Sequence, residues 1–404
     1  MKVKIWKASL LLIVIFMLSA ATSARAATLT TIIPSPTIDQ TSVLYANGYI
    51  FVSGYTGGDI EVISDATNAK VADIQVYLGA PYGLAYDSNK GEIWAATTGG
   101  AAAFSDVPPF NSVANVTDTN GFELAAFDAK TGEVFMAFNG PITVISDNTN
   151  TVTATITQSV DGIVDDSAKG EVFASQYLDE SGLSTGNVYV ISAQTNTVTA
   201  TIALTGVPGS LVYDSGKGEI FVQNSLPTYN LGGASPFNLQ VISDSTNKVV
   251  ATVNLSASDI FGDMAYNANK DELYMNSRAY LNATIITISD KTNSVLGTIN
   301  DNGTSAGGIA YDSATSSIYA VNYEGDAAGY LGSVAVISDP SSSSSVSNPT
   351  PTVTASTGTS STAIPTSTPK VPEFSNTVLP LVAAAIATVT LFAIVATKKK
   401  TVPK

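Results

Sequence analysis

The chain has 404 residues, of which 45% are hydrophobic, and it contains neither cysteine nor histidine. Disulfides, thiolate nucleophiles, His-ligated metals and imidazole acid–base catalysis are therefore excluded. The segment from Ala27 to Asp339 holds nine basic and 32 acidic side chains, a formal charge of about −23. This charge repels phosphate backbones, so we expect no nucleic-acid partner.

Residues 1–26 have the pattern of a secretory signal peptide. Three lysines lie within the first seven residues, residues 8–20 are almost wholly apolar, and Ala24-Arg25-Ala26 has the small-x-small form of a cleavage site. We expect cleavage between Ala26 and Ala27 and export of the rest of the chain.

Two short phrases alternate seven times between residues 27 and 339. The first is a turn such as Tyr86-Asp87 that leads into Gly91-Glu92-Ile93, and the second ends a strand with Ile-Ser-Asp or a close variant. The second phrase starts at Ile63, Phe104, Ile145, Ile191, Ile242, Ile288 and Ile337. Successive starts lie 41, 41, 46, 51, 46 and 49 residues apart. Short strands repeated with this period are typical of propeller blades.

Each repeat predicts a four-stranded antiparallel meander. Residues 83–96 supply two strands around a turn, the Ile-Ser-Asp phrase ends the third, and a Val/Thr-rich segment such as 152–156 supplies the fourth. An asparagine such as Asn150 suits the left-handed conformation in the turn between the third and fourth strands. We interpret the aspartates of the second phrase as caps of this turn, at Asp65, Asp147, Asp244 and Asp290.

The seventh repeat lacks a fourth strand, because Asp339 runs directly into Pro340. Residues 29–33 precede the first repeat and have the Thr/Ile pattern of the other fourth strands. We predict that they pair beside residues 334–337. The fold would then be all-β, a seven-bladed β-propeller closed by its N-terminal strand, with two sheet edges hidden from solvent.

The repeats resemble the YVTN-type β-propeller family of bacterial and archaeal surface proteins. The resemblance covers roughly residues 28–339 and rests on strands such as Ile318–Asn322 and Ile220–Asn224, with Ile-Ser-Asp where that family usually has Val-Ile-Asp. Other copies depart from the pattern, as at Trp94-Ala95-Ala96. The resemblance implies a secreted or surface-attached protein.

The C-terminal 65 residues predict a stalk followed by an anchor. Residues 340–371 are rich in Ser, Thr and Pro and cannot bury a core, which is typical of an extended stalk. Within residues 372–404, an uncharged stretch at 378–397 precedes a basic tail, which predicts a transmembrane helix with a cytoplasmic C-terminus. The tripeptide Pro372-Glu373-Phe374 before it resembles the PEF-type sorting signal of archaea, which implies a sorting protease as a partner. The alternative is an ordinary membrane anchor.

Enlarged segments between second and third strands, at 176–187, 224–238, 276–282 and 322–332, carry aromatic residues that we take as candidates for ligand binding. They are Tyr177, Tyr229, Phe237, Tyr280, Tyr323 and Tyr330. Aromatic rings beside Asn and Asp suit stacking on sugars or gripping a peptide, so a cell-envelope glycan or protein is the expected partner. Alternatively, the segments only pack on one another.

Three aspartates, Asp161, Asp259 and Asp263, are expected near the mouth of the central channel. They would suit a hard cation such as Ca²⁺, or a carboxylate pair for glycoside cleavage. Propeller enzymes of the lactonase type typically rely on His, Arg and Glu. Residues 27–339 contain no histidine and one arginine, Arg278, so hydrolysis of this type is not expected. The leading hypothesis is a non-enzymatic binding or structural protein anchored at the cell surface, without a required cofactor. The alternative is an extracytoplasmic hydrolase or cation-dependent enzyme that uses these acids.

Overall fold

The structure, a computed structural model, describes residues 27–339 apart from 36–39, 139, 179–183, 226–236, 256–259, 280–281, 304–306 and 327–328. The predicted signal peptide, stalk, sorting motif and membrane helix lie outside the described residues. In the part of the chain that is described, no helix is both long enough and apolar enough to span a bilayer.

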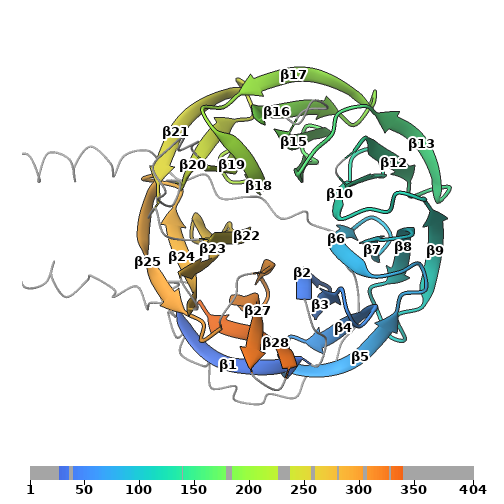
Figure 1. The fold of residues 1–404 in the computed structure, drawn as a ribbon, viewed down its shortest axis with the longest axis vertical. Helices are drawn as coiled ribbons and strands as arrows, with labels where there is room; N and C mark the ends of the chain where they lie inside the picture. The colour runs from blue at the N-terminus through green and yellow to red at the C-terminus, as the bar shows by residue number, and fades with distance from the viewer. Residues whose placement is uncertain are drawn as a thin grey trace, which may run out of the picture. The chain divides into compact units, whose positions relative to one another are not determined.

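The described residues contain 28 strands in seven four-stranded antiparallel sheets, arranged as blades around a central axis (Figure 1). From axis to rim, blade 1 consists of β2 (Gln40–Ala46), β3 (Tyr49–Gly54), β4 (Asp59–Ser64) and β5 (Ala69–Gln75). Blades 2 to 6 repeat this order. The prediction of a seven-bladed propeller is confirmed.

The remaining strands take equivalent places in the other blades. The innermost strands are β6 (Pro81–Asp87), β10 (Leu124–Asp128), β14 (Gly162–Asp166), β18 (Val207–Asp214), β22 (Ile260–Asn267) and β26 (Ile309–Asp312). The second strands are β7 (Glu92–Thr97), β11 (Glu133–Ala137), β15 (Glu171–Leu178), β19 (Glu219–Ser225), β23 (Glu272–Ala279) and β27 (Ser317–Asp326). The third strands are β8 (Gly100–Ser105), β12 (Ile142–Ser146), β16 (Ser184–Ser192), β20 (Phe237–Ser243), β24 (Asn282–Ser289) and β28 (Gly329–Ser338). The outer strands of blades 2 to 6 are β9 (Ser112–Thr117), β13 (Thr151–Ile156), β17 (Thr197–Ala203), β21 (Lys248–Asn254) and β25 (Ser294–Asn300).

The outer strand of blade 7 comes from the other end of the fold. Strand β1 (Thr28–Ser35) pairs antiparallel with β28, so that Leu29 faces Ile337 and Ile33 faces Val334. The register skips Thr30 of β1 in the same way as it skips Thr153 of the outer strand β13. The prediction that the N-terminal strand completes the ring is confirmed.

The core consists of seven apolar clusters, each between two neighbouring blades. Strand β7 shows how they are built: Ile93 packs against blade 1, and the adjacent Trp94 packs against blade 3. Since successive side chains point to opposite faces, a strand buried on both faces needs a continuous apolar run. The outer strand β9 has one exposed face and alternates instead.

The aspartates at the ends of the third strands differ from the prediction. Asp65 accepts a backbone hydrogen bond within its own turn, as expected of a cap. Asp147 and Asp244 instead contact lysines of the preceding blade: Lys90 Nζ lies 3.7 Å from Asp147 Oδ1, and Lys169 Nζ lies 2.8 Å from Asp244 Oδ1. These side chains therefore join blades, while the turn itself relies on asparagines in the left-handed conformation, such as Asn150 with φ 54°.

In blades 4, 6 and 7 most of the enlarged segment consists of paired strands. Pairing continues to Leu178 and Ser184 in blade 4, and to Asp326 and Gly329 in blade 7. In blade 6 the pairing continues to Ala279 of β23 and Asn282 of β24. In these three blades, cross-strand pairing therefore uses most of the added length.

Candidate functional site

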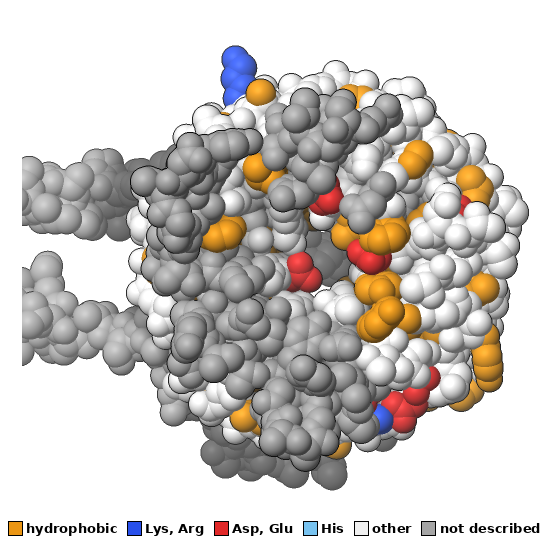
Figure 2. Space-filling model, in the orientation of Figure 1, with side chains coloured by type: hydrophobic (Ala, Val, Ile, Leu, Met, Phe, Trp, Pro, Cys, Tyr) orange, Lys and Arg blue, Asp and Glu red, His pale blue; other side chains and the backbone are white. Residues whose placement is uncertain are grey.

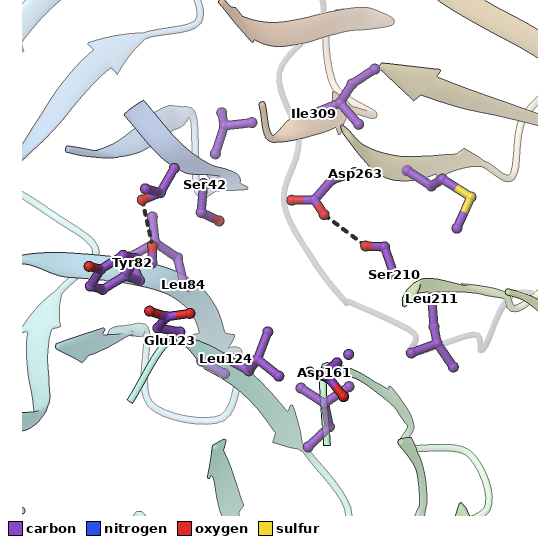
Figure 3. Close-up of a pocket in the computed structure, with 17 residues that line it drawn as sticks. Ser42, Tyr82, Leu84, Glu123, Leu124, Asp161, Ser210, Leu211, Asp263 and Ile309 are labelled. Atoms are coloured by element: carbon purple, nitrogen blue, oxygen red, sulfur yellow. Dashed lines mark hydrogen bonds between the residues drawn. The ribbon is translucent and has the colours of Figure 1, made fainter. Parts of the chain in front are cut away.

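The innermost strands surround a cavity of about 350 Å³ on the channel axis (Figure 3). Every blade contributes at least one apolar side chain to its lining, and these include Val43, Leu84, Ala125, Ile163, Leu211, Met264 and Ile309. The lining residues one or two positions earlier in each strand are mainly polar, among them Thr41, Ser42, Tyr82, Glu123, Asp161, Ser210 and Asp263. The cavity therefore has an apolar ring and, beside it, a polar ring, which we call the channel mouth.

Acidic side chains lie at the edge of the central opening (Figure 2). Glu123 precedes β10, and both its backbone N–H and its backbone carbonyl form hydrogen bonds. Its N–H donates to Ala137 O at 2.9 Å, and its carbonyl accepts from Gly83 N of blade 2 at 2.9 Å. Burial raises the pKa of the Glu123 carboxyl, because desolvation disfavours the charged form.

Asp263 of β22 links three blades. Ser210 Oγ of β18 donates to Asp263 Oδ1 at 2.8 Å, and the Asp263 N–H donates to Gly307 O at 3.2 Å (Figure 3). Burial raises the pKa of Asp263, and the Ser210 hydrogen bond opposes that shift. The carboxyl is therefore fixed in place by its neighbours.

The structure brings together two of the three aspartates that we considered as metal ligands. Asp161, whose N–H donates to Ser175 O at 2.9 Å, and Asp263 line the same cavity from blades 4 and 6. Asp259 lies outside the described residues. Across the described ranges, no group of three or more acidic side chains is placed to hold a metal ion.

Tyr82 and Glu123 belong to the channel mouth although we did not select them from sequence, and Tyr55 contacts Tyr82. The rings of Tyr55 and Tyr82 lie 5.4 Å apart, and Tyr55 is 47% exposed. Burial is the main cause that raises the pKa of Tyr82, and the charge of the nearby Glu123 raises it further. A signal was available, because Thr41, Tyr82 and Glu123 are spaced by 41 residues, the period of the first repeats.

Four of the six aromatic candidates lie in strands that the structure describes. Tyr229 and Tyr280 lie outside the described residues. Tyr177, Tyr323 and Tyr330 lie in β15, β27 and β28, where Tyr330 pairs with Gly325. Phe237 begins β20, is partly buried, and does not line the channel mouth.

The channel mouth favours ligands that carry positive charge. Among the described lining residues are three carboxylates from three blades and no lysine or arginine. The surrounding domain is itself strongly acidic, and a cleft lined by one sign of charge concentrates ligands of the opposite sign. A phosphate or carboxylate ligand would be repelled.

Comparison with known proteins supports the fold and no finer assignment. No protein-family model and no curated protein matches the chain. Among solved structures, Kuenenia stuttgartiensis hydrazine synthase is similar with a TM-score of 0.61 and 13% identity, over 72% of this chain and 94% of that chain. U3-55K is similar with a TM-score of 0.62 and 11% identity, over 77% of this chain and 99% of that chain. At such identities the similarity concerns the β-propeller fold alone.

Proposed function

We propose that this chain is an exported, surface-anchored β-propeller that binds a cationic segment of a cell-envelope protein at its channel mouth and catalyses no reaction. The observation that carries the proposal is the convergence of Glu123, Asp161 and Asp263 on one cavity whose described lining has no basic side chain.

The tyrosine pair adds a second means of holding a cation. Tyr82 lies beside Glu123, which contributes to the raised pKa of its phenol, and its ring contacts the exposed Tyr55. An ammonium or guanidinium group can bind an aromatic face and a carboxylate at once, which adds about 0.5–2 kcal/mol to a simple charge contact. A lysine- or arginine-containing segment fits this chemistry better than a metal ion does.

The test is calorimetric titration of the purified protein with a short peptide of four lysines separated by glycines, using a glutamine-for-lysine peptide for comparison. We expect binding of the lysine peptide alone. The double substitution Glu123→Gln/Asp161→Asn should weaken it at least tenfold. The control Asp59→Asn/Asp73→Asn removes the same charge from blade 1, away from the cavity, and should leave affinity within about twofold. Equal losses in both variants would show non-specific attraction and refute a site at the channel mouth.

We also propose the surface location and the anchor, which rest on the sequence outside the described residues. The signal peptide directs export, the Ser/Thr/Pro-rich stalk follows the propeller, and the apolar stretch at 378–397 anchors the chain. The YVTN-type resemblance agrees with this location. Mass spectrometry of both mature termini is the test. Loss of everything after the Pro372-Glu373-Phe374 region supports sorting, whereas an intact lysine tail supports an ordinary anchor.

A hydrolytic function is the alternative, and the raised pKa values of Glu123 and Asp263 favour it, because a carboxyl that keeps its proton can act as a general acid. Chromogenic glycosides and esters provide the assay. Turnover that Glu123→Gln abolishes would replace the binding proposal with this one.

A further inference from the structure

A second cavity, of about 520 Å³, lies on blade 3 and shares no lining residue with the channel mouth. The β9–β10 connection forms one wall through Asp118, Asn120 and Phe122. The β11–β12 connection forms the other through Phe138 and Pro141. We call this cavity the blade-3 pocket.

Two hydroxyl-bearing residues belong to the sheet part of the pocket. Thr143 of β12 and Thr155 of β13 face each other across the two strands and both line the cavity. Thr143 is 8% exposed. A threonine hydroxyl can both donate and accept a hydrogen bond. The pocket therefore offers hydroxyl groups from two neighbouring strands to a ligand.

The β9–β10 wall of the pocket is held in place by hydrogen bonds. Phe122 N donates to Thr97 O at 2.7 Å and Asp118 N donates to Gly99 O at 3.0 Å, which ties the β9–β10 connection to blade 2. Asp118 Oδ1 accepts from Asn120 N at 2.8 Å. Phe138 is 37% exposed although it lines the cavity. An exposed aromatic ring and hydrogen-bonded polar groups thus line the same cavity.

We propose that the blade-3 pocket binds a neutral sugar residue of a glycan. A pyranose offers an apolar C–H face for Phe138 and hydroxyls that can donate to Asp118 and exchange hydrogen bonds with Asn120 and Thr143. An anionic ligand is disfavoured because Asp118 is the one charged residue of the described lining. A purely apolar ligand would leave these polar groups unsatisfied. The volume lies within the range of about 300–1,000 Å³ for small-molecule sites.

The test is saturation-transfer NMR of the purified protein with a panel of disaccharides of glucose, galactose, mannose and N-acetylglucosamine. At least one should bind, and Phe138→Ala should weaken it at least tenfold. Thr143→Val keeps the shape of the side chain while removing the hydroxyl, and it should weaken binding three- to tenfold.

Two control variants separate this site from others. Tyr77→Ala removes an 89% exposed aromatic ring from the β5–β6 connection and should leave affinity unchanged. The channel-mouth variant Glu123→Gln/Asp161→Asn should also leave it unchanged, so this proposal and the proposed function can fail independently. The proposal is overturned if no disaccharide binds, or if binding survives both Phe138→Ala and Thr143→Val with unchanged melting temperatures.

Discussion

Ion pairs between a lysine and an aspartate link neighbouring blades. The lysine lies in the turn that follows the innermost strand of its blade. The most enclosed pair is Lys270 of blade 6 with Asp339 of blade 7, whose side chains are 13% and 1% exposed. Asp339 also accepts hydrogen bonds from Asn267, at 2.9 Å, and from Tyr274. A buried carboxylate with three donors is costly to disturb, because each donor is left without its partner.

We therefore predict that Asp339→Ala lowers the free energy of unfolding by about 3–5 kcal/mol. Chemical denaturation followed by circular dichroism is the measurement. Lys291→Ala is the control, because Lys291 pairs with Asp271 at 2.6 Å on the open surface, where solvent screens the interaction. It should leave the midpoint unchanged, and equal effects of the two substitutions would contradict the interpretation.

Blade 4 breaks the residue pattern at two linked positions. Tyr213 of blade 5 donates to Asp244 at the end of the third strand, but blade 4 has Asp165 in the tyrosine position and Ala193 in the aspartate position. Asp165 is hydrogen bonded to the fully buried Asp128 of blade 3. Burial, with the neighbouring carboxylates as further causes, raises the pKa of Asp165 to about 8.

This pair makes stability depend on pH. The unfolded chain releases the Asp165 proton near pH 4, whereas the folded chain keeps it to about pH 8. Between these values unfolding releases a proton, so stability falls as pH rises, by at most about 1.4 kcal/mol per pH unit. We predict that Asp165→Asn removes this dependence and stabilises the protein at pH 8. Melting temperatures from pH 5 to pH 9 test it; a variant that melts in parallel with the original protein would refute it.

Among the strands, the pattern of apolar residues follows from how many faces of the strand are buried. Second and third strands lie between two blades and consist of apolar runs, as in β3. Outer strands bury one face, and β1 follows the same alternation as β17. This equivalence is why a strand that lies outside the first repeat can complete the last one.

Adjacent residues of β1 provide a matched test of that assignment. Ile33 is 8% exposed and packs in the cluster between blades 7 and 1, whereas Ile32 is 36% exposed. Ile33→Ala should lower the free energy of unfolding by about 2–4 kcal/mol. Ile32→Ala should cost well under half as much, since its side chain leaves no closed cavity. Denaturant titration of the two variants measures both losses of stability. A larger loss for Ile32→Ala than for Ile33→Ala would mean that β1 is placed in the wrong register.

At the scale of the whole molecule, β1 closes the ring. Without it, blade 7 would keep three strands and β28 would expose an unpaired edge. The clusters that Ile33 and Leu29 join on the two sides of blade 7 would also be opened.

Deleting residues 28–35 should therefore lower the melting temperature by at least about 10 °C, while the far-ultraviolet spectrum stays that of a β protein. Deletion of the same number of residues from the Ser/Thr/Pro-rich stalk, 345–352, is the control and should leave the melting temperature unchanged. An unchanged midpoint after loss of β1 would show that closure contributes little.

The amino-acid sequence is sufficient to predict the number of blades, the order of strands within them and the source of the closing strand. These follow from local patterns: a period of 41 to 51 residues, turn chemistry, and alternation or its absence along each strand. It also placed Asp161 and Asp263 near the channel. The 41-residue spacing of Thr41, Tyr82 and Glu123 indicates that these residues occupy equivalent positions. Only the tertiary structure shows that these positions line one cavity with Asp161 and Asp263, and that Phe138 and Thr143 share a pocket with Asp118. Whether these residues lie close together depends on how far each innermost strand extends toward the axis and on how neighbouring connections pack. A ring brings residues 140 positions apart, such as Glu123 and Asp263, around one cavity, and no local pattern records that proximity.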